Sequence, residues 1–379
     1  MTIADRLRKA PWSVPILAVA LTAVGVTTIA TAAEGHPVEY AWMQVRWAFV
    51  GAAAALLVLA PAYLRIVAAW PVLYALGTSL LVVVLFKGTG QSAGRWIGVG
   101  GFRMQPSEFM KLLLVVALAA TLRYSREHRR LRGFARPMVL VLVPFLLVVR
   151  QPDLGTAVLF VPLFFALLYA AGARGTHLAG VALAGLLAAV GLAFVPGVLK
   201  DYQRDRLFAF VAEHTDAKAA SALKQSQSHQ LHQGLTSIGL GGWTGVGDEE
   251  GGVVEATRDV PERHSDFIFP VFAARFGFLG VTGLLLLYAA FLGAVLSTAG
   301  RVREPSGRFL VVGVFALFAV QVVVNLGMTV GLLPVVGVPL PFMTYGGSSL
   351  LTSFLAIGLV MNVGADPPIE LGRVGIDDD

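Results

Sequence analysis

The stretch that decides the fold is residues 266–298, which read DFIFPVFAARFGFLGVTGLLLLYAAFLGAVLST. This stretch is almost continuously apolar and is longer than the roughly 20 residues that a helix needs to cross a bilayer. Its only acid, Asp266, stands where a long polar segment runs into the apolar run. The stretch therefore predicts a transmembrane helix with a carboxylate at its boundary, and a carboxylate in that position is a candidate functional group.

The rest of the chain shares this apolar character. Of its 379 residues, 56% are hydrophobic and only 14% are charged, and the mean hydropathy is +0.74. Soluble domains carry about a quarter charged residues, so the composition indicates an integral membrane protein with a single domain over residues 1–379. The net charge of +6 does not indicate nucleic-acid binding, because the basic residues lie in short loops between apolar runs. The sequence contains no cysteine, which excludes disulfides and cysteine-based catalysis.

We expect an all-α fold, because backbone that faces lipid must form its hydrogen bonds internally. The first apolar run follows a basic segment as in a signal peptide, but its length and the later spans indicate a retained anchor. The second and third spans are separated only by a turn at Arg65, and a long loop, about 199–265, separates the seventh span from the eighth. About ten spans are predicted, with approximate limits 12–33, 43–64, 66–86, 107–124, 136–149, 154–172, 176–197, 266–298, 308–331 and 345–364.

The basic residues predict the orientation of the chain in the membrane. Arginine and lysine are concentrated before the first span, after the fourth and after the eighth, which all fall on one side if there are ten spans. Short basic loops remain in the cytoplasm. We therefore expect both termini to be cytoplasmic, with a disordered tail over about 366–379. The first outer loop carries Glu34 and Glu39 and no Lys or Arg, and four further notable loops are expected at the cell exterior: 87–105, 150–153, 199–265 and 332–344.

Polar residues gather in the outer loop 87–105 and at the start of the fourth span. They are Arg95, Trp96, Gln105, Glu108 and Lys111. Glu108 and Lys111 lie three residues apart on one helix face. They form either a self-compensating ion pair, with Lys111 reaching the surface, or a polar cluster beneath an outward cavity. The guanidinium of Arg95 suits phosphate oxygens, while Trp96 suits either a ligand or the membrane interface.

Further candidates precede the sixth and eighth spans. Asp153 either caps the sixth span or supplies a second carboxylate to the same cavity. Ser265 or Asp266 can cap the eighth span, and Asp266 can instead pair with Arg263. A glycine-rich run, 238–247, allows close approach of the backbone or simply forms turns. It is not a phosphate-binding P-loop, because no Gly-Lys-Ser/Thr follows it.

Several motifs follow one another along nearly the whole chain. They are Arg95-Trp96, Gln105-Pro106-Ser107-Glu108 with Lys111, Gln151-Pro152-Asp153-Leu154-Gly155, Pro261-Glu262-Arg263-His264-Ser265-Asp266-Phe267, and Pro339-Leu340-Pro341-Phe342 with Tyr345-Gly346-Gly347-Ser348-Ser349. This set resembles the SEDS family (shape, elongation, division, sporulation). The segment Tyr202-Gln203-Arg204-Asp205-Arg206 looks more like the elongation member RodA than the division member FtsW.

The resemblance implies a peptidoglycan glycosyltransferase that polymerises lipid II on the outer face of the bacterial cytoplasmic membrane. Its implied partner is a class B penicillin-binding protein that acts as the transpeptidase. The family's essential acid corresponds to Asp266, and its polar motif positions correspond to Arg95, Trp96, Gln105, Glu108, Lys111, Asp153, Arg263 and His264. One departure is that family members often carry acids after the aspartate, where this chain reads Phe272-Ala273-Ala274-Arg275-Phe276.

The implied reaction makes a β-1,4 link from an α-linked lipid pyrophosphate, so it inverts the anomeric carbon. Inversion is expected from one direct displacement with a single base. We expect Asp266 to be this base. The pyrophosphate, of lipid II or of an undecaprenyl-linked glycan strand, is expected to be held by Arg95, Lys111, Arg204 or Arg206, with or without Mg²⁺ or Mn²⁺. The alternatives are a lipid II flippase, an FtsW-like division polymerase, and a non-catalytic scaffold that recruits a penicillin-binding protein.

Overall fold

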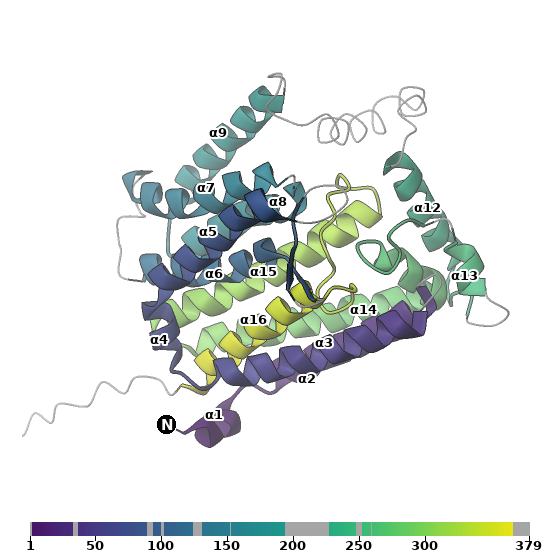
Figure 1. Ribbon diagram of the computed structural model, residues 1–379, viewed down its shortest axis with the longest axis horizontal. Coiled ribbons are helices and arrows are strands. Elements are labelled where there is room, and N and C mark those ends of the chain that lie inside the picture. The colour runs from purple at the N-terminus through teal and green to yellow at the C-terminus, as the bar shows by residue number, and fades with distance from the viewer. Residues whose placement is uncertain are drawn as a thin grey trace, which may run out of the picture.

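The computed structural model describes residues 2–32, 37–88, 94–99, 102–123, 131–151, 153–193, 227–247, 252–258 and 260–366 (Figure 1). Within these residues the chain is a bundle of helices with one short β-hairpin. The elements are α1 (Ile3–Lys9), α2 (Ser13–Ala32), α3 (Pro37–Val58), α4 (Tyr63–Ala68), α5 (Trp70–Lys87), β1 (Ile97–Val99), β2 (Phe102–Met104), α6 (Pro106–Leu122), η2 (Leu131–Phe134), α7 (Ala135–Arg150), α8 (Leu154–Ala170), α9 (Gly175–Ala193), α12 (Gln227–Leu240), α13 (Gly252–Ala256), α14 (Ile268–Arg301), α15 (Pro305–Thr329) and α16 (Gly347–Ala365).

The expected helical membrane fold is confirmed, because each expected span coincides with an apolar helix. Within the described ranges, six of these helices are individually long and apolar enough to cross a membrane, namely α2, α3, α5, α14, α15 and α16. The limits differ most at the second span, where α3 begins at Pro37 and ends at Val58. Proline suits the first turn of a helix, and Pro61 disfavours helix before it. The short helix α4 replaces the turn expected at Arg65.

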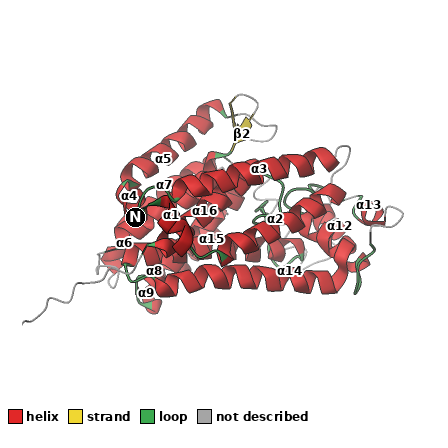
Figure 2. Ribbon diagram, turned by 90° about the horizontal axis from the view of Figure 1, so that it is seen from below, coloured by secondary structure: helices red, strands yellow, loops and turns green. Residues whose placement is uncertain are grey.

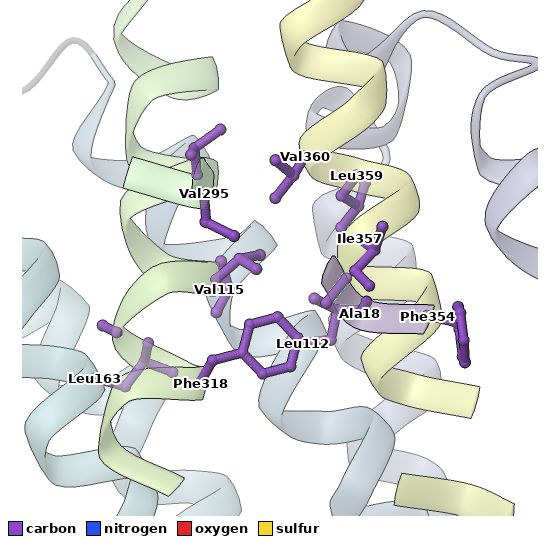
Figure 3. Packing of buried hydrophobic residues seen from close by; sticks show 14 of the residues in the cluster. Ala18, Leu112, Val115, Leu163, Val295, Phe318, Phe354, Ile357, Leu359 and Val360 are labelled. Carbon is purple, nitrogen blue, oxygen red and sulfur yellow. The ribbon is translucent and has the colours of Figure 1, made fainter. Parts of the chain in front are cut away.

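Helix α6 lies in the centre of the bundle. It packs against α5, α7, α8, α15 and α16. Leu112 and Val115 of α6 meet Phe318 of α15 in the apolar core, together with side chains from α8, α14 and α16 (Figure 3). A helix that is covered on nearly all sides is buried, so polar residues in its first turns lie in the interior of the protein.

Helix α14 is broken at Gly277, where φ is 61° and ψ is −164°. The segment after the break, 278–301, rises about 36 Å and can cross the hydrocarbon core of about 30 Å alone. The segment before the break, 268–276, is therefore not needed for the crossing. This corrects the expectation of one continuous span over 266–298.

The glycine-rich run 238–247, which begins in the last turn of α12, packs against this break. The amide of Phe278 donates to the carbonyl oxygen of Gly242 (2.9 Å) and so has a partner although the helical ladder is interrupted. A Cβ atom on Gly277 would lie only 2.3 Å from the amide nitrogen of Gly245. Of the two alternatives for this run, close approach of its backbone to another segment is therefore confirmed, and that segment is α14 at Gly277. Figure 2 shows α12 and α13 gathered beside α14, within the long segment that was expected to be a loop.

The hairpin β1–β2 was not expected. Its strands pair antiparallel, with Ile97 opposite Met104. Strands of three residues are too short to produce a recognisable alternation of apolar and polar residues. The hairpin leads directly into α6, so it fixes where Arg95 and Gln105 enter the bundle. The expected tail 366–379 lies, apart from Asp366, outside the described residues.

Candidate active site

Asp153 is the centre of a buried polar network at the start of α8. Its Oδ1 accepts a hydrogen bond from the amide of Thr156 (3.2 Å), which makes it the N-cap of the helix. Its Oδ2 accepts from the side-chain amide of Gln105 (2.9 Å) and from the hydroxyl of Ser107 (3.1 Å). The Arg95 guanidinium lies 3.9 Å from the same carboxylate. The expected capping role of Asp153 is confirmed, and the same carboxylate also joins side chains from the hairpin segment and the start of α6.

Arg95 lies at the edge of this network. Its side chain is 31% exposed, and its Nε donates to the backbone carbonyl of Gln151 (3.2 Å). These two contacts direct the guanidinium across the start of α8 while part of it remains accessible to a ligand. Trp96 is half-buried beside it, at the start of the hairpin. The other two arginines expected to hold pyrophosphate, Arg204 and Arg206, lie outside the described residues.

Glu108 and Lys111 form an ion pair in the first turns of α6. The Lys111 Nζ lies 2.8 Å from a Glu108 carboxylate oxygen, and the two side chains are 1% and 5% exposed, respectively. The expected ion pair is therefore present. The same alternative also placed the Lys111 head group at the surface, and this part is wrong, because the helices around α6 cover it. Burying a charge pair is costly, and within a membrane domain such a pair indicates a functional region.

Asp266 precedes α14 without capping it. The helix begins at Ile268, its N-cap is Phe267, and no side chain forms a cap hydrogen bond. The capping alternative for Ser265 or Asp266 is therefore wrong. Asp266 is half-buried, and its Oδ2 would lie 3.0 Å from a Cβ atom on Gly337. The carboxylate thus lies against the loop that follows α15, and a Cβ atom at position 337 would crowd it.

The same loop connects Asp266 with the Asp153 network. A Cβ atom on Gly155, two residues after Asp153, would lie 2.3 Å from the carbonyl oxygen of Val336. The next loop residue, Gly337, is the one that contacts the Asp266 carboxylate. Two consecutive loop residues therefore touch the two acidic motifs. Since the Asp153 carboxylate already joins Arg95 and Gln105 at the starts of α6 and α8, the structure gathers most of the described part of the expected site at one end of the bundle.

Asn325 is a residue of this site that the sequence analysis missed. It is fully buried near the end of α15, and its side-chain amide donates to the backbone carbonyls of Asp266 (2.9 Å) and Val338 (2.7 Å). One side chain therefore fixes both the segment that carries the acid and the loop that lies against it. The signal that could have found it is an asparagine within a long apolar run, because polar residues in membrane helices normally have a structural or functional partner.

Replacing Asn325 by Ala should lower kcat for the reaction at Asp266 by about 10- to 100-fold, because small displacements of reacting groups have effects of that size. The substitution also removes the donor for two buried carbonyls, which costs about 1–3 kcal/mol for each unsatisfied group. Steady-state kinetics on folded protein in detergent would separate kcat from KM. The matched control is Thr329→Val, one turn later, because the Thr329 hydroxyl bonds only within its own helix among the contacts shown. An Asn325→Ala protein with normal kcat would contradict a positioning role.

Arg263 holds the segment before Asp266. Its side chain is buried, and its Nη1 donates to the backbone carbonyl of Thr257 (3.1 Å). Burial lowers the pKa of its guanidinium from the usual value. This contact joins Arg263 to Thr257, at the end of α13, so Arg263 stabilises the segment that leads to Asp266.

His264 lies in an aromatic cluster. Its ring stacks on Tyr40, with centroids 5.1 Å apart and planes 25° apart, and lies 6.1 Å from the ring of Tyr345. Its backbone carbonyl accepts from the amide of Tyr345 (3.0 Å). Burial lowers the pKa of His264, and the nearby Glu262 carboxylate opposes this effect. Burial therefore favours the neutral form of the stacked imidazole.

Replacing His264 by Phe should retain the stacking and remove part of the acid sensitivity of the fold. A histidine whose pKa is lowered by folding binds fewer protons than the unfolded chain, so its stabilising contribution is lost as the pH falls below about 6.5. When the pH is lowered from 8 to 5, the thermal midpoint in detergent should fall further for the wild type than for His264→Phe, by ~1–3 °C. Equal decreases of the thermal midpoint in the two proteins would show that His264 does not contribute to the acid sensitivity of the fold. A loss of activity in His264→Phe at pH 8 would instead place the imidazole at the substrate.

No group of three or more His, Asp or Glu side chains converges within the part of the chain that the structure describes. The described residues alone therefore do not form a complete protein cage for a metal. Magnesium is commonly held by one or two carboxylates together with substrate phosphates. A site of this open kind is the only one that the described donor set fits.

Comparison with known proteins gives consistent matches over nearly the whole chain. A family model described as "Cell cycle protein", which covers FtsW, RodA and SpoVE, matches residues 9–367. A relative named probable peptidoglycan glycosyltransferase FtsW, from Thioalkalivibrio sp. (strain K90mix), is 37% identical over 386 residues, which cover 97% of this chain and 93% of the relative. A chain from a peptidoglycan synthase complex that coordinates polymerization and crosslinking has a TM-score of 0.79 at 30% identity, over 93% of this chain and 97% of that one. The rod shape determining protein RodA of Thermus thermophilus has a TM-score of 0.68 at 29% identity, over 93% and 96%.

Proposed function

Since the chain belongs to the SEDS family of FtsW, RodA and SpoVE proteins, we propose that it is a peptidoglycan glycosyltransferase that joins lipid II units into glycan strands. The predicted family is confirmed by the family match, and the predicted enzyme class agrees with the name of the FtsW relative. The observation that carries the proposal is the placement of Asp266. Asp266 is not the N-cap of α14, and its carboxylate lies against Gly337, on the loop that also contacts the Asp153 motif.

In the proposed reaction, the 4-hydroxyl oxygen of the acceptor sugar attacks the anomeric carbon of the donor. Asp266 accepts the hydroxyl proton as the attack proceeds. The bond from the anomeric carbon to the pyrophosphate oxygen breaks, and undecaprenyl pyrophosphate leaves with the bonding electron pair. One displacement inverts the α-linked donor to a β-1,4 product without a covalent intermediate.

The departing pyrophosphate requires positive charge rather than an acid. Among the described residues, Arg95 is best suited to supply it, because its guanidinium is partly exposed beside the Asp153 network. Lys111 is buried and paired with Glu108, so we assign it to the floor of the site. Trp96, Gln105, Arg263 and His264 complete the proposed substrate region by packing and hydrogen bonding. A divalent cation, Mg²⁺ or Mn²⁺, would add positive charge at the pyrophosphate oxygens.

The interactions at the other end of the bundle favour a polymerase over a flippase. There, the buried Arg6 side chain donates to the carbonyl of Pro61 (2.7 Å) and to the side chain of Asn362 (2.8 Å). Glu304 caps α15 and pairs with Arg123. A flippase must open to lipid headgroups at both ends, whereas these contacts tie helices together at the end opposite Asp266. A non-catalytic scaffold would not need the buried charges of the Asp266 end.

The remaining parts of the proposal concern the cell. The basic loops support an orientation with both termini in the cytoplasm and Asp266 at the outer face of the bacterial cytoplasmic membrane. The similarity to a chain of a peptidoglycan synthase complex supports a class B penicillin-binding protein as partner. The segment 202–206, outside the described residues, favours a role in elongation. The similarity to FtsW keeps a division polymerase as the alternative.

The proposal is tested with purified protein in liposomes that contain fluorescent lipid II. The expected product is a ladder of glycan strands on a gel, formed without added transpeptidase and increased by the partner. Adding EDTA and then Mg²⁺ or Mn²⁺ tests the cation. Movement of lipid II across the bilayer with no polymer formed would overturn the proposal in favour of the flippase.

A further inference from the structure

A largely apolar groove lies between α2 and α14. Its volume is about 310 Å³, and its lining includes Val24, Thr27, Phe276, Gly280, Gly283 and Leu287. A Cβ atom on Gly283 would meet no other atom within 4 Å. The missing side chain at this position therefore leaves part of the groove open.

Arg275 stands at one end of the groove. Its Nη1 donates to the backbone carbonyl of Thr27 (2.8 Å), and its guanidinium carbon lies 4.8 Å from the centroid of the Phe276 ring. Both contacts hold the charge beside residues that line the groove. The same Nη1 also lies 3.5 Å from the Thr31 hydroxyl. A guanidinium has five N–H donors in a planar fork, so phosphate oxygens can bind it in addition to contacts that it already makes.

The length of the groove matches one leaflet of a bilayer. From Phe278, the first residue after the break, to Leu287 the helix rises about 14 Å, which is close to half of the hydrocarbon thickness of about 30 Å. Arg275 lies beyond Phe278 on the Asp266 side, and its partner Thr27 lies in the last two turns of α2. The groove therefore runs from the headgroup level of that leaflet to about the midplane.

The volume and the position restrict the occupant. A helix about 10 Å wide and 14 Å long fills on the order of 1,000 Å³, so a partner helix does not fit within the groove. A lipid-linked substrate would have to reach Asp266, whose carboxylate faces the loop after α15, whereas Arg275 faces α2. An ordinary phospholipid fits both restrictions, because its phosphate and one acyl chain need no access to the active site.

We propose that this groove binds an anionic glycerophospholipid, with its phosphate on Arg275 and one acyl chain beside Gly280 and Gly283. The bound chain fills the space between α2 and the segment of α14 after the break. It thereby holds α2 against the broken helix, near the glycine-rich run that packs on Gly277. The site is separate from the proposed glycosyltransferase site and does not depend on that activity.

The test is native mass spectrometry of the whole protein released from nanodiscs made of phosphatidylglycerol and phosphatidylcholine. The wild type should retain one phosphatidylglycerol in preference to phosphatidylcholine. Gly283→Leu, which fills the groove, and Arg275→Gln, which removes the charge, should each lower this retention at least about fivefold. In detergent, added phosphatidylglycerol should raise the thermal midpoint of the wild type but not of these variants.

Two control variants make the result specific. Gly293→Leu adds the same side chain to an exposed position of α14 that is equally open but outside the groove, and Arg174→Gln removes an exposed charge after α8. Both should retain the lipid as the wild type does. Equal retention in Gly283→Leu, equal binding of the two phospholipids, or preferential retention of undecaprenyl phosphate would each overturn the proposal. A monodisperse elution profile shows that each variant is folded.

Discussion

Replacing Asp266 by Asn should abolish the polymerisation of lipid II and leave the protein folded. The substitution keeps the size of the side chain and removes its ability to accept a proton, and loss of a general base lowers rates by about 10²–10⁴-fold. Folding should survive, because Asp266 does not cap α14 and its backbone carbonyl still accepts the Asn325 hydrogen bond. The measurement is the initial rate of strand formation in liposomes, normalised to folded protein from size-exclusion chromatography.

The matched control for this prediction is Glu255→Gln. Glu255 is an exposed acid on α13, in the same part of the chain but outside the proposed site. The Glu255→Gln variant should therefore polymerise lipid II at the wild-type rate. Full activity in Asp266→Asn would eliminate the base role. Equal losses in both variants would show that the assay reports a general effect of charge on the protein or on its insertion.

The positions of the membrane helices could be predicted because each helix corresponds to one continuous apolar run in the sequence. The ends at α7 and α8 agree within two residues with the expected limits, since charged residues and the Pro152 region mark them in the sequence. The break at Gly277 could not be predicted in this way, because a glycine within an apolar run is compatible with a continuous helix. What breaks the helix is a contact with Gly245, more than thirty residues earlier in the chain.

The chemistry of the site was predictable as a set of residues but not as an arrangement. Asp153 and Gln105 belong to recognisable motifs, yet their hydrogen bond joins two elements 48 residues apart. The burial of Lys111 depends on the helices that surround α6, which the sequence near Lys111 does not describe. Asn325 was missed because its importance lies in two backbone carbonyls that the loop geometry alone brings to it.

Replacing Gly277 by Ala should cause the largest loss of stability of any single substitution considered for this chain. Its φ of 61° and ψ of −164° lie in a region that is essentially restricted to glycine and costs other residues about 1–3 kcal/mol. The added Cβ would also lie 2.3 Å from the backbone nitrogen of Gly245, and backbone cannot move aside as a flexible side chain can. We expect the thermal midpoint in detergent to fall by about 10 °C or more, since 1 kcal/mol corresponds to roughly 2–4 °C in a large domain.

Gly293→Ala separates this effect from a general sensitivity of α14 to substitution. Gly293 is in the same helix, has no neighbour within 4 Å of an added Cβ, and should gain about 1 kcal/mol from the better helix propensity of alanine. If Gly277→Ala straightens α14 instead of unfolding it, the run 238–247 is displaced. Limited proteolysis should then cut near Trp243, and polymerisation should fail because Asp266 moves with the first segment of the helix. A Gly277→Ala protein as stable and as active as Gly293→Ala would show that α14 is continuous in the membrane, and the placement of Asp266 would then need another cause.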